Sequence, residues 1–167
     1  QTAPVMNNPG ENFGVFRTKK KVFNQNSYIG GMFTSRLGMN GLYNVAYGVD
    51  GLFRVTGNEY LNLKVAQTRE NNVDNKIFDN SPSRLLIEWQ RRNEKGFGYD
   101  LLYSYSGESF NPGIGFETRD SYKAYAGTLH YGWFSEKNSA IRYQKISFSE
   151  KEGLSIVFAD PVSDLGD

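Results

Sequence analysis

The segment between Tyr43 and Val55 constrains the fold more than any other part of the chain. Its odd-numbered positions, apart from Gly51, carry large apolar or aromatic residues, whereas the even-numbered positions are mostly small, polar or charged. Successive side chains of a β-strand point to opposite faces, so this alternation predicts a strand with one apolar and one mostly polar face. Strands in globular proteins are usually about five or six residues long. A longer alternating strand is typical of a transmembrane β-barrel, in which lipid-facing and lumen-facing residues alternate.

The composition is compatible with such strands. The 167 residues suffice for one domain, their mean hydropathy is -0.57, and no apolar run is long enough for a transmembrane helix. Aromatic residues nevertheless make up 15% of the chain, and there are 18 Gly residues. Both features fit strands with one apolar face and one face in contact with water. A soluble all-β domain can have the same composition, and this alternative stays open.

Charge and cysteine content exclude some kinds of site. The chain has no Cys, which rules out disulfides, thiolate nucleophiles and Cys-based zinc sites. The net charge is +1, with acidic and basic residues interspersed. The one basic run, from Arg17 to Lys21, lacks an accompanying helix or a stacking platform for bases. We interpret it as a solvated or headgroup-facing strand end and expect no nucleic-acid partner.

The alternating segments predict an all-β fold, an antiparallel up-and-down meander of about eight long strands that forms an outer-membrane β-barrel or a portion of one. Turn residues separate the segments. The predicted strands are 12–21, 27–37, 42–55, 60–69, 84–92, 97–106, 122–134 and 140–149, with a short ninth segment at 154–158. Residues 140–149 have no clean apolar face, which predicts a bulge or an edge strand there.

We expect residues 1–167 to form a single domain or fragment. Residues 1–11 are a lead-in, 12–158 carry the strands and 159–167 form a polar tail. The N-terminus lacks the features of a signal peptide, and the C-terminus lacks the aromatic residue that commonly closes an outer-membrane barrel. We therefore expect a mature form or a portion of a longer protein.

Connection lengths support the meander. Short breaks follow the third, fifth and seventh predicted strands, whereas long breaks, 70–83 and 107–121, follow the fourth and sixth. A membrane-spanning meander has short turns on one side and longer external loops on the other. We therefore expect the loops after the second, fourth and sixth strands to share one side.

The alternation also assigns residues to faces. The predicted lipid-facing rows are Leu61, Leu63 and Val65; Leu85, Ile87 and Trp89; Phe97, Tyr99, Leu101, Tyr103 and Tyr105; and Tyr125, Leu129, Tyr131 and Trp133. Tyr60, Trp89, Phe97 and Trp133 are predicted girdle residues at the membrane interface. The predicted polar residues of the lumen are Asp50, Arg54, Lys64, Glu88, Asp100 and His130. In a soluble sandwich the same apolar rows would instead pack a core.

Catalytic motifs are scarce, so we predict that the protein is not an enzyme. His130 is the only histidine, and the small residues on its face favour a hydrogen-bonding role over a catalytic one. No nucleophile–base motif, metal motif or calcium loop occurs, and the Gly-rich pairs do not precede helices. We expect no cofactor and no metal.

The segment from Gly107 to Arg119 is the distinctive connection. Pro112 starts a turn, and Gly113 and Gly115 permit positive φ. We expect an ordered external loop that pins the sixth predicted strand to the seventh, with Arg119 tied to a carboxylate or to backbone carbonyls. Phe110 and Phe116 would pack together or on neighbouring strands. The alternative is a ligand-binding loop with Phe110, Asn111, Phe116 and Arg119 as binding residues.

This loop carries a resemblance. The pattern formed by Gly107, Phe110-Asn111-Pro112, Gly115-Phe116 and Arg119, together with Asn26 to Gly30, Gly48 and Asp50, resembles a C-terminal domain of Gram-negative envelope proteins. In those proteins a family-9-type carbohydrate-binding module precedes a domain of unknown function that is expected to form an outer-membrane β-barrel. The similarity spans roughly residues 12–149. It implies a barrel portion without the sugar-binding module, and it transfers no catalytic residue.

Together these observations predict a non-enzymatic component of the outer membrane of a Gram-negative bacterium. Its role would be that of a scaffold, an anchor or a pore associated with carbohydrate handling. The expected partners are outer-membrane lipid and, in addition, other envelope proteins, the remainder of a longer chain, or carbohydrate. The alternative is a soluble lectin-like β-sandwich that binds sugars through exposed aromatic residues.

Overall fold

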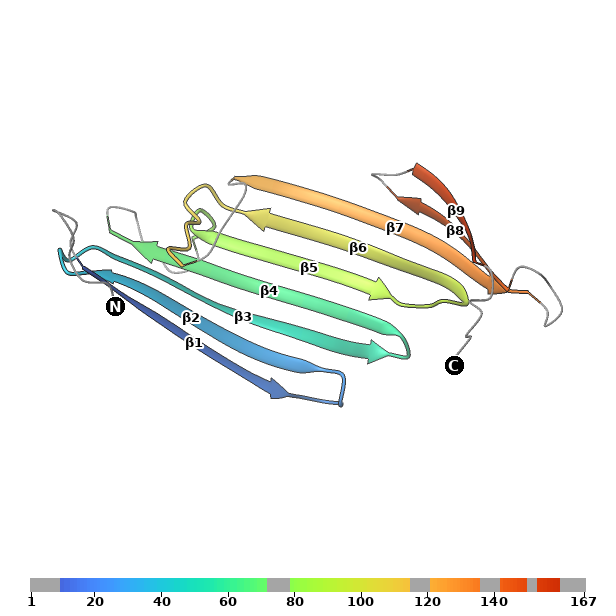
Figure 1. Ribbon diagram of the computed structural model, residues 1–167, viewed down its shortest axis with the longest axis horizontal. Helices are drawn as coiled ribbons and strands as arrows, with labels where there is room; N and C mark the ends of the chain where they lie inside the picture. Colours follow the sequence, from blue (N-terminus) through green and yellow to red (C-terminus); the bar gives the residue numbers. More distant parts are fainter. Residues whose placement is uncertain (1–9, 72–78, 115–120, 136–141, 150–152, 160–167) are drawn as a thin grey trace, which may run out of the picture.

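The computed structural model consists of a single antiparallel sheet (Figure 1). It describes residues 10–71, 79–114, 121–135, 142–149 and 153–159, the last of these for the backbone only. The strands are β1 (Glu11–Lys21), β2 (Tyr28–Gly38), β3 (Tyr43–Thr56), β4 (Glu59–Glu70), β5 (Ser83–Arg91), β6 (Gly96–Ser106), β7 (Tyr122–Phe134), β8 (Tyr143–Ser149) and β9 (Gly153–Ala159).

The nine strands follow one another in space in the order of the sequence, and each neighbouring pair is antiparallel. The predicted all-β, up-and-down meander is therefore confirmed. Strand boundaries agree with the prediction to within one residue, except that β8 begins at Tyr143 rather than at residue 140. Within the described residues, no helix is long and apolar enough to cross a membrane.

The pairing register places side chains on two faces of different character. Val49 pairs with Val65, which pairs with Leu85, which in turn pairs with Tyr105. All the rows predicted to be apolar lie on this one face, which we call the apolar face. Asp50 pairs with Lys64 on the opposite, polar face. The other predicted polar residues lie there too: Arg54, Glu88, Asp100 and His130.

The division between the two faces is not complete, and β1 and β4 give examples. In β1, Phe13 and Val15 lie on the polar face, opposite Arg36 and Thr34 of β2. In β4, Tyr60 pairs with Arg54 and also lies on the polar face, so its assignment to the interfacial girdle is wrong.

The prediction of an irregular or edge-located eighth strand is also wrong. β8 pairs with β7 on one side and with β9 on the other, and neither register contains a shift. Ile146 and Phe148 join the apolar face opposite Tyr131 and Leu129. The irregularity of the sheet lies elsewhere, between Arg54 and Thr56 at the end of β3.

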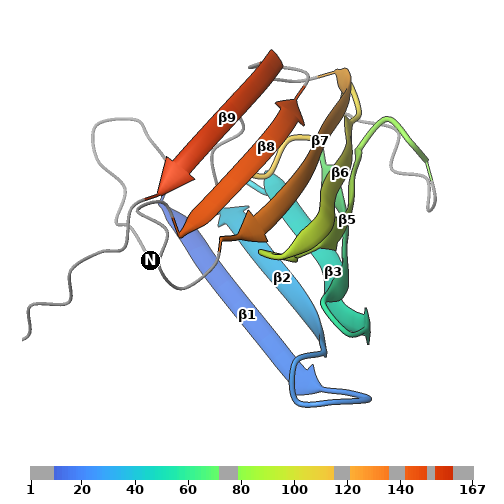
Figure 2. The same ribbon diagram turned by 90° about the vertical axis from the view of Figure 1, so that its right-hand side faces the viewer.

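The apolar face is largely open in the described structure. Its exposed side chains include Val49, Val65, Trp89, Leu101, Leu129 and Phe148. Among the described residues, Phe110 is the one large hydrophobic side chain that is buried, with 5% of its surface exposed. The sheet is strongly curved, and β1 and β9 are its two edges (Figure 2).

Candidate functional site

An ion pair joins β1 and β3 across β2 on the polar face. Arg17 Nη1 lies 2.6 Å from Asp50 Oδ1, and Arg17 Nη2 donates a hydrogen bond of 2.8 Å to Asp50 Oδ2. The pair can reach across because Gly30 of β2 lies between the two strands. A Cβ atom at Gly30 would come within 3.0 Å of Asp50 Oδ1. The Asp50 side chain is only 11% exposed, whereas the Arg17 side chain is 43% exposed, so the carboxylate is the shielded member of the pair.

Small residues beside this pair leave a central hollow in the polar face. Ala46, Gly48 and Ala66 lie next to one another on β3 and β4, where longer side chains would fill the space. The hollow has a volume of about 540 Å³. Its charged lining residues are Arg17, Asp50, Lys64 and Arg84, and its apolar lining includes Met32, Leu86, Phe110, Pro112 and Ile114.

The loop after β6 folds back onto the polar face and forms one wall of the central hollow. The buried Thr68 hydroxyl accepts a hydrogen bond of 3.2 Å from Asn111 N. Asn44 Nδ2 donates to the carbonyl oxygen of Asn111 at 2.8 Å. Ser109 N donates to the carbonyl oxygen of Ser81 at 2.9 Å. These bonds agree with an ordered loop as far as Ile114. They hold it against β3, β4 and the segment before β5, whereas the prediction was a loop that pins β6 to β7.

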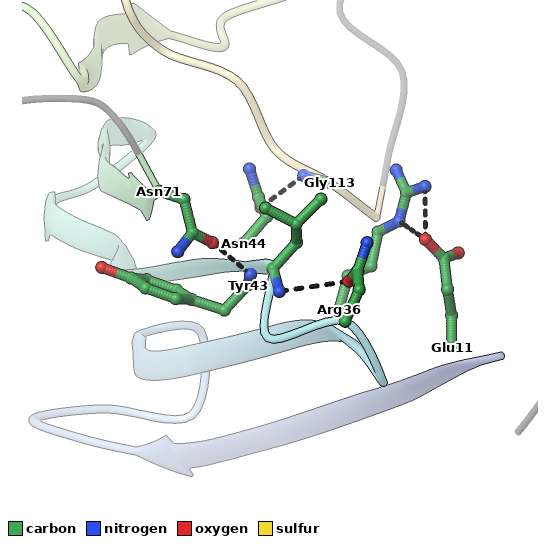
Figure 3. A network of polar contacts seen from close by, with 8 residues as sticks. Glu11, Arg36, Tyr43, Asn44, Asn71 and Gly113 are labelled. Carbon is green, nitrogen blue, oxygen red and sulfur yellow. Dashed lines mark hydrogen bonds and ion pairs between the residues drawn. The ribbon is translucent and has the colours of Figure 1, made fainter. Parts of the chain in front are cut away.

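Gly113 is needed for space rather than for an unusual backbone conformation. Its N–H donates a hydrogen bond of 2.7 Å to Asn44 Oδ1 (Figure 3). A Cβ atom at this position would lie 2.6 Å from the same oxygen. The positive-φ glycines among the described residues are Gly41, Gly57 and Gly96. Gly113 does not adopt the positive φ that a glycine permits, and close approach to Asn44 is the physical reason for a glycine there.

A smaller polar pocket of about 260 Å³ lies at the rim, next to this loop. Its side chains bind mainly one another. Asn44 Nδ2 and Asn111 Nδ2 both donate to Glu70 Oε2, at 2.9 Å and 3.0 Å. Arg36 donates two hydrogen bonds to Glu11 across the β1–β2 pair (Figure 3). Because these groups already have partners, the rim network holds the loop in place and has little unused capacity for a ligand.

The remaining polar-face candidates are distributed over several strands. His130 Nε2 lies 2.9 Å from the carbonyl oxygen of Asn93, in the turn between β5 and β6. Gly98, opposite His130, provides the space for the imidazole, since a Cβ atom there would lie 2.2 Å from Nε2. His130 therefore links β7 to a turn, which accords with the hydrogen-bonding role that the sequence favours.

Glu88, Asp100 and Arg54 likewise have neighbouring partners. Glu88 Oε2 accepts from Asn62 Nδ2 at 3.0 Å, and Asp100 Oδ2 accepts from Gln90 Nε2 at 2.8 Å. Arg54 donates to the carbonyl oxygen of Gly57 in the β3–β4 turn. Of the six predicted lumen residues, only Asp50 and Lys64 come together at the central hollow.

The predicted binding loop is only partly described. Asn111 is bonded to β3 and β4, and Phe110 is buried beside the central hollow, whereas Phe116 and Arg119 lie outside the described residues. The sequence interpretation missed Asn44, Thr68 and Glu70, which anchor the loop. Their placement at polar positions of long strands was visible in the sequence, but a partner 69 positions away, as for Asn44 and Gly113, was not.

The described residues contain no group of three or more His, Cys, Asp or Glu side chains that could hold a metal ion. In comparisons with known proteins, no family profile, curated protein or solved structure matches the chain.

Proposed function

We propose that this chain is a non-enzymatic component of a bacterial outer-membrane β-barrel, with the apolar face toward lipid and the polar face toward an aqueous interior. The main observation behind the proposal is that large hydrophobic side chains of the sheet are exposed, whereas several polar side chains are buried. Exposed large hydrophobic side chains run across β2 to β8 on the apolar face, while the buried side chains of the polar face include Thr34, Asn44, Thr68 and Ser104. A bilayer removes such an apolar face from water without a second protein layer.

Strand length and aromatic placement support the same proposal. β3 has 14 residues, β7 has 13, and β2 and β6 have 11 each. At about 3.3 Å per residue and a tilt of about 45°, such strands cover about 25 Å or more of the membrane normal. Trp89, Phe97 and Trp133 are exposed near the ends of neighbouring strands, where girdle residues meet the headgroups.

The role we propose is that of a scaffold, an anchor or a pore at the Gram-negative envelope. The sequence resemblance described above supports an association with carbohydrate handling, either through the rest of a longer chain or through another envelope protein. A soluble lectin-like sandwich is the alternative, and it would need a second layer over the apolar face.

Side-chain environments test the proposal directly. Spin labels are placed one at a time at Leu63, Ile87 and Leu101 of the apolar face, with neighbouring labels at Lys64, Glu88 and Asp100 as matched controls. In lipid vesicles, we expect oxygen to relax the first set and a water-soluble nickel complex to relax the second, because adjacent residues of a strand face opposite sides. Equal access of the nickel complex to both sets would refute the membrane proposal and favour the soluble sandwich.

A further inference from the structure

We propose that the central hollow binds a small organic anion, with the oxyanion group held at Lys64 and an apolar body against the loop after β6. The inference rests on the proposed function, because it takes the polar face to be the water-accessible interior. It assigns this interior a ligand class that neither the fold nor the resemblance specifies.

Among the described residues that line the hollow, cations outnumber carboxylates. Three cations, Arg17, Lys64 and Arg84, line it together with one carboxylate, Asp50. Arg17 already makes both of its close contacts with that carboxylate. Lys64 is the cross-strand neighbour of Asp50 but has no carboxylate within ion-pair distance in the described part of the chain. An incoming anion would therefore meet an ammonium group that is exposed and not engaged in an ion pair.

Arg84 is a second basic residue close to Lys64 on the polar face. Arg84 pairs with Ala66 on β4, so it lies diagonally across from Lys64 on the same face. Side chains in this relation are about 7–8 Å apart at their bases, within reach of long side chains that converge on one ligand. Arg84 Nη2 donates a hydrogen bond of 3.4 Å to the Tyr122 hydroxyl of β7, so the oxyanion group is assigned to Lys64 rather than to Arg84.

The rest of the lining is apolar and shaped by small residues. Ala46, Gly48 and Ala66 form the floor, while Leu86, Pro112 and Ile114 contribute to the walls. The volume of about 540 Å³ falls within the range of small-molecule sites, roughly 300–1,000 Å³. A hollow lined by both cationic and aliphatic side chains is suited to an anion that carries an apolar body.

The test uses the full chain in a non-ionic detergent and the probe 4-(trifluoromethyl)benzoate, observed by fluorine NMR. The uncharged 4-(trifluoromethyl)benzamide serves as the matched ligand, and empty micelles give the background. We expect saturable binding of the benzoate and about tenfold weaker binding of the benzamide, because a charge-assisted hydrogen bond is lost.

Variants then locate the site. Lys64→Gln is expected to weaken benzoate binding about tenfold, and Lys64→Arg to retain it within about threefold, since the charge is kept. Ala66→Leu should abolish binding by filling the hollow. Lys145→Gln is the control, because Lys145 lies on the polar face of β8 and outside the hollow, and it should bind as the parent does. If Lys64→Gln does not fold, the Ala66→Leu variant and the comparison of benzoate with benzamide still test the proposed site.

Three results would overturn the inference: no saturable binding above the micelle background, equal binding of benzoate and benzamide, or equal losses in Lys64→Gln and Lys145→Gln. The spin-label experiment in lipid vesicles separates the two proposals. If apolar-face labels contact lipid and no benzoate binds, only the anion site fails. If all labels contact water, the membrane proposal fails, whatever the probe does.

Discussion

At the scale of single residues, glycines on the polar face lie where another side chain occupies their space. Gly30 makes room for the Arg17–Asp50 pair, Gly98 for the imidazole of His130 and Gly113 for the amide of Asn44. None of these three is a positive-φ glycine. Their role is steric, and it can be tested by adding one methyl group.

We expect Gly113→Ala to lower the free energy of unfolding by about 1–3 kcal/mol, because the new Cβ would overlap Asn44 and displace the loop. The matched control is Gly127→Ala on β7, whose Cβ would meet only Leu101 Cδ2, at an ordinary 3.6 Å. Equilibrium unfolding in urea measures both variants. Equal stabilities for Gly113→Ala and the parent would show that the loop does not depend on its contact with Asn44.

At the scale of elements, the loop after β6 depends on one buried anchor, Phe110. We expect Phe110→Ala to destabilise the protein by about 3–5 kcal/mol, the usual cost of removing a buried phenylalanine side chain. Phe23→Ala is the control, because Phe23 is 91% exposed in the β1–β2 turn and should contribute little. The two variants are compared by thermal unfolding.

The same variants distinguish the two interpretations of the loop. A structural loop predicts the stability loss at Phe110 described above. If Phe110→Ala instead abolished binding to a panel of oligosaccharides with no change in thermal stability, the loop would be a ligand-binding element.

Elements also show what the sequence can predict. Alternation with a period of two was sufficient for the strands and, apart from Tyr60 of β4, for the assigned faces of β3 to β7, because each strand carries its own pattern. β8 was misjudged because Tyr143 and Lys145 on one face, and Gln144 on the other, obscure a register that its neighbours determine. The site was predicted less well. Asp50 and Lys64 were identified, but the contribution of Pro112 and Ile114 to the same hollow depends on how a distant loop folds back.

At the scale of the whole molecule, the exposed apolar face should decide how the protein behaves in solution. We expect the purified chain to be monodisperse in detergent and to aggregate when detergent is removed, because side chains such as Val49, Trp89 and Leu129 would then meet water. Size-exclusion chromatography with light scattering measures this. A monodisperse chain without detergent would contradict the expectation.

The number of strands has a consequence for closure. In an antiparallel meander of nine strands, the first and the last run in the same direction. A seam made by β1 directly against β9 would therefore be parallel, unlike every other pairing in the sheet. If two copies were inserted with the same orientation, β9 of one copy would lie beside β1 of the other. That pairing would again be parallel. A closed barrel in which every neighbouring pair is antiparallel needs an even number of strands. Closure of this sheet in that way would therefore require an odd number of additional strands between β9 and β1.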